Sequence, residues 1–171
     1  MSAEFANRMD RVRAERLRPM TVAALDGVVE LERLVYPFPW SRANFVDSLA
    51  AGYTSWTLDG PGDELIGYCI AMRGVDEMHL LNITIAPPAR RRGHARRMLG
   101  ELVLLCRSEG ARRLWLEVRE SNADARATYV RLGFEHVGIR KGYYPAPEGR
   151  REDAVVMSLV LDDRDESDAL D

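Results

Sequence analysis

The sequence has little cysteine, with only Cys69 and Cys106 in 171 residues. Each lies in an apolar run, where a cysteine usually packs as a small hydrophobic side chain. His79, His94 and His136 are each isolated from other metal-ligating residue types. These absences predict no disulfide framework, no metal site and a reducing, cytoplasmic setting.

Long apolar runs are also missing. No stretch reaches the roughly 20 apolar residues that span a bilayer. Residues 1–18 carry arginines but neither an apolar segment nor a small-residue cleavage site, so they do not resemble a secretory signal. We therefore expect no membrane association. The length allows one domain with a full hydrophobic core.

Lysine is almost absent, because all but one of the 24 basic residues are arginines and Lys141 is the exception. We attribute this bias to genomic base composition and expect no direct nucleic-acid binding. Although the net charge is only −3, the charges are unevenly distributed along the chain. Residues 1–16 form a basic arm, and residues 163–171 form an acidic tail. Both ends are expected to be poorly ordered, which leaves residues 17–162 as a single folded domain.

Hydrophobic periodicity predicts helices over residues 25–35, 96–109 and 123–132, the last capped by Asn122, and a further short helix capped by Ser41. Strand signals fall at residues 20–23, 54–58, 65–72, 78–86, 114–118, 134–139 and 154–161. The near-continuous apolar run at 78–86 predicts a strand buried on both faces. An antiparallel meander followed by alternating strands and helices predicts an α/β fold with a mixed (α+β) sheet.

The segment from Arg90 to Ala95 follows a predicted strand and directly precedes a predicted helix. A helix amino terminus offers unpaired N–H groups and a partial positive charge. Gly93 permits close backbone approach, and the arginines add charge-assisted hydrogen bonds, so the segment can hold a pyrophosphate. From the residues alone, a solvated basic turn or a nucleic-acid patch stays open.

The order of strand, Arg-x-x-Gly-x-Ala and helix resembles the acetyl-CoA pyrophosphate loop of the GNAT acyltransferases. Residues 114–119, 121–123 and 129–134 resemble the protein-N-terminal acetyltransferase branch. Residues 36–41 match the substrate-side loop of that branch, and residues 142–145 and 151–157 match its carboxy-terminal strands. The likeness runs from about Leu17 to Leu161. It implies the GNAT fold, with a central, mostly antiparallel sheet flanked by helices.

The resemblance implies two proton-handling side chains. Glu117 would take the proton of the attacking amine, and Tyr129 would protonate the departing CoA thiolate. An α-amine with an ordinary pKa of about 7.7–8.0 is easier to neutralise than a lysine near 10.4, and a tyrosine hydroxyl near 10 is protonated at neutral pH. From the residues alone, the alternatives stay open that Glu117 is a solvent-facing strand residue and that Tyr129 is a core residue with a satisfied hydroxyl.

The resemblance also implies acetyl-CoA as the co-substrate, without a metal. Main-chain groups of residues 83–85 would hold the pantetheine arm, the arginine-rich loop would hold the pyrophosphate, and Asn122 would contact the cofactor in addition to capping its helix. The cofactor-binding residues implied are Ile83, Thr84, Ile85, Arg91, Arg92, Gly93, His94, Ala95, Arg96 and Asn122.

The acceptor implied by the RimI-like members of this branch is the N-terminal alanine of a small-subunit ribosomal protein. Other protein N-termini, lysines or small amines stay open as acceptors, and an RNA-binding module is the alternative from another class. Arg150 and Arg151 suggest one extra residue in the turn before Glu152. The basic arm lies before the part of the chain that resembles the family. The sequence does not indicate an oligomeric state.

Overall fold

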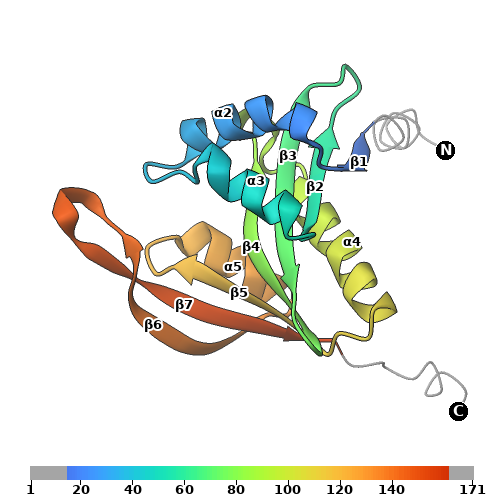
Figure 1. Ribbon diagram of the computed structural model, residues 1–171. Helices are drawn as coiled ribbons and strands as arrows, with labels where there is room; N and C mark the ends of the chain where they lie inside the picture. The colour runs from blue at the N-terminus through green and yellow to red at the C-terminus, as the bar shows by residue number, and fades with distance from the viewer. Residues whose placement is uncertain (1–14, 162–171) are drawn as a thin grey trace, which may run out of the picture. The chain divides into compact units, whose positions relative to one another are not determined.

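The computed structural model describes residues 15–161 (Figure 1). Its strands follow one another in the order β1-β2-β3-β4-β5-β7-β6 within a single sheet. The described residues divide into two compact units, one reaching to Met72 and including Leu80–Leu99, the other comprising Arg73–His79 and the residues from Gly100 onward. The expected acidic tail and all but the last two residues of the expected basic arm lie outside the described residues.

The first unit begins with strand β1 (Arg16–Pro19), which pairs antiparallel with β2 (Thr54–Asp59). The strand expected at residues 20–23 is therefore wrong, because Val22–Ala24 form a single 3-10 turn. β1 is a four-residue edge strand whose residues are mostly exposed. Backbone pairing rather than an apolar pattern creates it, so hydrophobic periodicity does not reveal it.

Two helices follow where they were predicted. Helix α2 (Leu25–Val35) ends at Tyr36, since Pro37 cannot continue it. Helix α3 (Arg42–Ala50) begins with a capping box: the Ser41 hydroxyl accepts the N–H of Asn44, and the Asn44 side chain accepts the N–H of Ser41. The predicted cap at Ser41 is confirmed.

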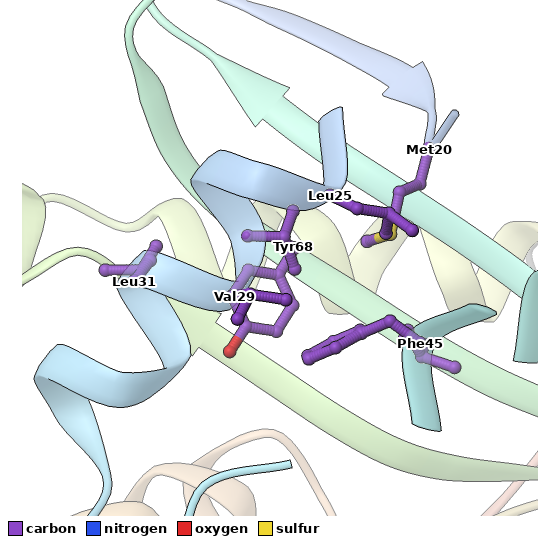
Figure 2. Packing of buried hydrophobic residues seen from close by; sticks show 8 residues of the cluster. Met20, Leu25, Val29, Leu31, Phe45 and Tyr68 are labelled. Atoms are coloured by element: carbon purple, nitrogen blue, oxygen red, sulfur yellow. The ribbon is translucent and has the colours of Figure 1, made fainter. Parts of the chain in front are cut away.

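The core of this unit lies between α2, α3 and strand β3 (Leu65–Arg73), which pairs antiparallel with β2. Figure 2 shows Leu25, Val29 and Phe45 gathered around Tyr68. The Phe45 and Tyr68 rings meet edge to face at 5.7 Å between centroids. Aromatic pairs in this geometry add stability beyond the area that they bury.

Strand β4 (Glu77–Ile85) departs from the expectation of burial on both faces. Met78, Leu80 and Thr84 are buried, while Ile83 and Ile85 on the other face are only half-buried. The apolar run therefore reflects one covered face and one partly covered face, and the sequence expectation was wrong on this point.

Gly67 on β3 lies against the part of β4 that the sequence analysis assigns to cofactor binding. A Cβ atom at this position would lie 2.5 Å from the main-chain oxygen of Thr84 and 2.8 Å from Ile85 Cδ1. Because backbone cannot yield as a flexible side chain does, Gly67→Ala should lower the free energy of unfolding by about 1–3 kcal/mol. Thermal denaturation measures the change in stability.

The matched control is Gly100→Ala in helix α4 (His94–Ser108), where no atom lies within 4 Å of an added Cβ. Alanine is the better helix former, so this variant should gain up to about 1 kcal/mol. A Gly67→Ala protein that melts at the wild-type temperature would contradict the close approach of β3 to β4.

Helix α4 itself begins two residues before the predicted Arg96 and stops before Gly110, which has a φ of +72°.

The second unit contains strands β5 (Arg113–Arg119), β6 (Glu135–Pro145) and β7 (Arg151–Val160) and helix α5 (Ala123–Arg131). β7 pairs antiparallel with both β5 and β6. Strands β6 and β7 extend beyond the predicted 134–139 and 154–161, because polar residues continue the pairing into a long hairpin. The Asn122 side chain accepts the N–H of Ala125 at 3.2 Å, which confirms the predicted cap of α5.

Candidate functional site

The arginine-rich loop turns sharply before helix α4. Arg91 and Gly93 both adopt the left-handed region, with φ of +61° and +87°, and α4 begins at the next residue, His94. No atom lies within 4 Å of a Cβ added at Gly93. Arg90 donates from Nε to the main-chain oxygen of Ile85 at 3.1 Å, which ties the loop to β4. Exposed arginines beside a helix amino terminus form an arrangement that fits an anionic group.

The side chain of His94 turns inward and is 7% exposed. Its Nδ1 atom lies 3.4 Å from a carboxylate oxygen of Glu15, which also accepts from Arg97 Nη1 at 2.9 Å. The buried His94 side chain is therefore engaged within the fold. His94 would therefore contact a ligand bound at the loop through its main chain.

Residues 83–85 of β4 lie next to a part-buried pair of hydroxyl groups. The Thr84 side chain is buried, and its hydroxyl lies 2.9 Å from the Tyr36 hydroxyl. Tyr36 also approaches the main-chain oxygen of Ile83 at 3.4 Å. Burial raises the pKa of Tyr36 above its ordinary value. The Thr84 hydroxyl therefore already has hydrogen-bond partners within the fold. This segment would bind a ligand through its main-chain groups.

Glu32 is a buried carboxylate on helix α2, and the sequence analysis predicted no functional role for it. It is 2% exposed and accepts the main-chain N–H of Trp40 at 2.8 Å. The Tyr68 hydroxyl and the Asn82 amide, the latter at 3.2 Å, also donate to it. Burial raises the pKa of Tyr68 well above its ordinary value, and the hydrogen bond to Glu32 raises it further. The detectable signal was a carboxylate at an apolar helical position.

Glu117 lies on β5 opposite Val156 of β7. Its side chain is 13% exposed, and its Oε1 atom lies 3.2 Å from Nε of Arg140 on β6. The Tyr144 hydroxyl donates to the Glu117 main-chain oxygen at 3.0 Å. The partly buried carboxylate therefore has a charged partner, which removes most of the cost of placing an acid in an apolar strand. Sequence reasoning found Glu117 but not Arg140.

Tyr129 lies on helix α5 and is half-buried. Its ring meets Phe134 edge to face at 5.6 Å between centroids. Its main-chain oxygen accepts the N–H of Phe134 at 3.0 Å. The ring therefore packs as a core residue does, whichever role the hydroxyl has.

A second polar cluster fixes the end of β5 to the hairpin. Arg119 donates to Glu152 at 2.9 Å and to the main-chain oxygen of Pro145 at 2.8 Å, and its guanidinium lies 4.6 Å from the Tyr144 ring centroid. Glu152 also accepts the main-chain N–H of Ser121 at 2.8 Å. Although burial alone would raise the pKa of Glu152, the hydrogen bonds from Ser121 and Arg119 lower it.

Both cysteines are buried, which agrees with the prediction that each packs as a small hydrophobic side chain. Burial raises the pKa of Cys106 to about 11, so this thiol stays protonated at neutral pH and is a poor nucleophile. Within residues 15–161, no group of three or more His, Cys, Asp or Glu side chains is placed to hold a metal ion. Over the same residues, no helix is both long and apolar enough to cross a bilayer.

Comparison with known proteins decides the family. Residues 25–134 match the acetyltransferase (GNAT) family. The [ribosomal protein bS18]-alanine N-acetyltransferase of Haemophilus influenzae is 39% identical over 136 residues, which cover 80% of this chain and 92% of that protein. The chain belongs to the GNAT acetyltransferase family.

Solved GNAT structures agree with the fold. The crystal structure of the ribosomal-protein-S18-alanine N-acetyltransferase from Escherichia coli has a TM-score of 0.79 and 34% identity, covering 86% of this chain and 94% of that one. NAA60 of Arabidopsis thaliana in complex with acetyl-CoA has a TM-score of 0.74 at 21% identity, covers 86% and 98% of the two chains, and supports the fold alone. The predicted GNAT fold, a mostly antiparallel sheet flanked by helices, is confirmed.

Within each unit of this GNAT protein, predicted site residues do come together. In the first, Ile85 of β4 and the arginine-rich loop are joined through Arg90. In the second, Asn122 and Tyr129 share the short helix α5. Arg140, the ion-pair partner of Glu117, was not predicted. Neither was Glu32, which accepts the main-chain N–H of Trp40.

Proposed function

We propose that this GNAT protein transfers an acetyl group from acetyl-CoA to the N-terminal α-amine of a protein, specifically the N-terminal alanine of a small-subunit ribosomal protein in the cytoplasm. The observation that carries the proposal is 39% identity to a relative so named, over 92% of that relative's length. Similarity over almost a whole enzyme favours a shared acceptor more strongly than a shared fold does.

We assign the cofactor to groups of the first unit. Exposed Arg91, Arg92 and Arg96 would surround the pyrophosphate with charge, and the main-chain N–H groups at Gly93, His94 and Ala95 would donate to it. Main-chain groups of residues 83–85 would hold the pantetheine arm in the manner of an added strand. Bound acetyl-CoA supplies the thioester that is attacked.

Glu117 is the proposed general base. Its carboxylate would take the proton from the acceptor ammonium, directly or through one water, while Arg140 keeps it oriented at 3.2 Å. An α-ammonium has an ordinary pKa of about 7.7–8.0, so the proton to be removed is held weakly at neutral pH. The nitrogen then attacks the acetyl carbon, and no covalent acetyl-enzyme is needed.

Tyr129 is the proposed general acid, and its hydroxyl would give a proton to the departing sulfur. Packing of its ring against Phe134 at 5.6 Å fixes the direction of the side chain. Asn122, which caps the same helix, would contact the cofactor beside it. Starting from an ammonium, the nitrogen loses two protons. The first goes to Glu117 and from there to solvent, and the second, lost as the amide forms, would restore the proton that Tyr129 gives to the sulfur, so one proton is released per turnover.

The acceptor is tested with purified protein, acetyl-CoA and three peptides, with release of the CoA thiol as the measurement. One peptide begins with alanine, the second is the same peptide blocked at the α-amine, and the third is blocked and carries an internal lysine. Only the first should react at an appreciable rate. Reaction of the blocked lysine peptide at a similar rate would replace the N-terminal assignment with a lysine acetyltransferase.

A further inference from the structure

A chain of buried and part-buried hydrogen bonds joins the loop at residues 36–40 to strand β4. At its centre, Glu32 accepts from the Trp40 main chain at 2.8 Å, from Tyr68 and from Asn82 at 3.2 Å. These three donors come from the loop, from β3 and from β4. Figure 2 shows Tyr68 reaching from its strand to the side of α2 that carries Val29.

The direction of each bond follows from the donors available. A carboxylate only accepts, so Asn82 faces Glu32 with its amide nitrogen and turns its amide oxygen to Thr84, whose hydroxyl donates to it at 3.1 Å. Thr84 has one hydroxyl hydrogen. Its oxygen therefore accepts from the Tyr36 hydroxyl, which lies 2.9 Å away. Every donor along this path points toward Glu32.

This network holds the loop at both of its ends. Tyr36 is fixed through its hydroxyl to β4, and Trp40 is fixed through its main-chain N–H to Glu32. Between them, Pro37 and Pro39 have no N–H to donate. Strand β4 is held by the backbone pairing of the sheet, whereas the loop has these two attachments together with the packing of the Trp40 ring on Phe45 at 5.4 Å between centroids.

We propose that Glu32 is a positioning residue that fixes the 36–40 loop and thereby the binding of the acceptor peptide. The inference rests on the proposed function and on the resemblance of residues 36–41 to the substrate-side loop of the N-terminal acetyltransferases. Glu32 touches no reacting atom, because its two oxygens are buried and already accept three hydrogen bonds. Its loss should therefore act on the KM of the acceptor and leave the Kd of acetyl-CoA within about threefold of wild type.

Two substitutions separate hydrogen bonding from charge. In Glu32→Gln the amide oxygen can keep the Trp40 N–H, while the new NH₂ group faces Tyr68 and Asn82, whose side chains can each turn to accept. Glu32→Ala removes the acceptor of the buried Tyr68 hydroxyl and of the part-buried Trp40 and Asn82 donors. We expect Glu32→Ala to raise the acceptor KM about tenfold or more, and Glu32→Gln to raise it no more than about threefold.

The experiment measures acceptor KM, kcat, the acetyl-CoA Kd and the melting temperature for wild type, Glu32→Ala, Glu32→Gln and Tyr36→Phe, with the alanine peptide as acceptor. Asp26→Asn is the matched control, because Asp26 lies on the same helix but pairs with Arg42 at the surface, so its KM should not change. A folded Glu32→Ala protein with wild-type acceptor KM would overturn the proposal, as would an equal loss in Glu32→Ala and Glu32→Gln.

If Glu32→Ala does not fold, Tyr36→Phe decides, because it removes one attachment of the loop and keeps the ring. A raised acceptor KM at near wild-type melting temperature supports the proposal, and an unchanged KM overturns it. Failure of the proposed function looks different, since wild type itself would then acetylate no peptide. In that case hydrogen exchange at the Trp40 amide still tests the attachment, with faster exchange expected in Glu32→Ala and wild-type exchange contradicting it.

Discussion

Replacing Glu117 by glutamine should lower kcat/KM for the alanine peptide at pH 7 by about 100-fold or more. The substitution keeps the size of the side chain and removes the group that takes the proton. At pH 7 the acceptor amine, with an ordinary pKa of about 7.7–8.0, is mostly protonated and needs a base. Above that pKa it is neutral without help, so the deficit should shrink to less than about tenfold at pH 9.

The measurement is a pH–rate profile of wild type and Glu117→Gln between pH 6.5 and about 9.5. Arg140→Gln is the matched control, because it breaks the 3.2 Å ion pair and keeps the carboxylate. It should lose far less activity than Glu117→Gln. An equal deficit at every pH, or an equal loss in Arg140→Gln, would mean that Glu117 holds the hairpin in place and is not the base.

Replacing Tyr129 by phenylalanine should lower kcat about 100-fold and leave the Kd of acetyl-CoA within about threefold of wild type. The change removes only the hydroxyl, so the ring still packs edge to face on Phe134. The melting temperature should therefore stay near that of wild type. The loss falls on kcat because the proton is needed only as the thiolate departs.

Steady-state kinetics and calorimetric titration with acetyl-CoA measure the two effects. Tyr53→Phe is the control, since it removes a hydroxyl from a partly buried tyrosine packed on the core of the first unit. That variant should turn over at the wild-type rate. If Tyr129→Phe instead loses acetyl-CoA affinity and keeps kcat, the tyrosine is a packing element and another group protonates the sulfur.

Local signals in the sequence predicted much of the fold. The bounds of α2 and the caps at Ser41 and Asn122 depend on residues close together in the chain, which is why they could be predicted. The strand Arg16–Pro19 and the long β6–β7 hairpin depend on pairing with distant partners. The first is only four residues long and mostly exposed, and polar residues continue the second, so periodicity missed the first and shortened the second.

The candidate site divides in the same way. Glu117 and the arginine-rich loop were identifiable because their motifs are local. Glu32 stood out only as an acid among apolar helical positions, since its partners Tyr68 and Asn82 lie 36 and 50 residues away in sequence. Arg140 likewise meets Glu117 only through the pairing of β5 and β6 with β7.

Transfer of a deuterium-labelled acetyl group tests the central claim most directly. The protein is incubated with labelled acetyl-CoA and the alanine peptide, and tandem mass spectrometry locates the label. We predict one labelled acetyl group on the α-nitrogen of the alanine, formed only when both protein and acetyl-CoA are present. Label on a lysine side chain, or an unmodified peptide after many expected turnovers, would contradict N-terminal acetyl transfer by this GNAT protein.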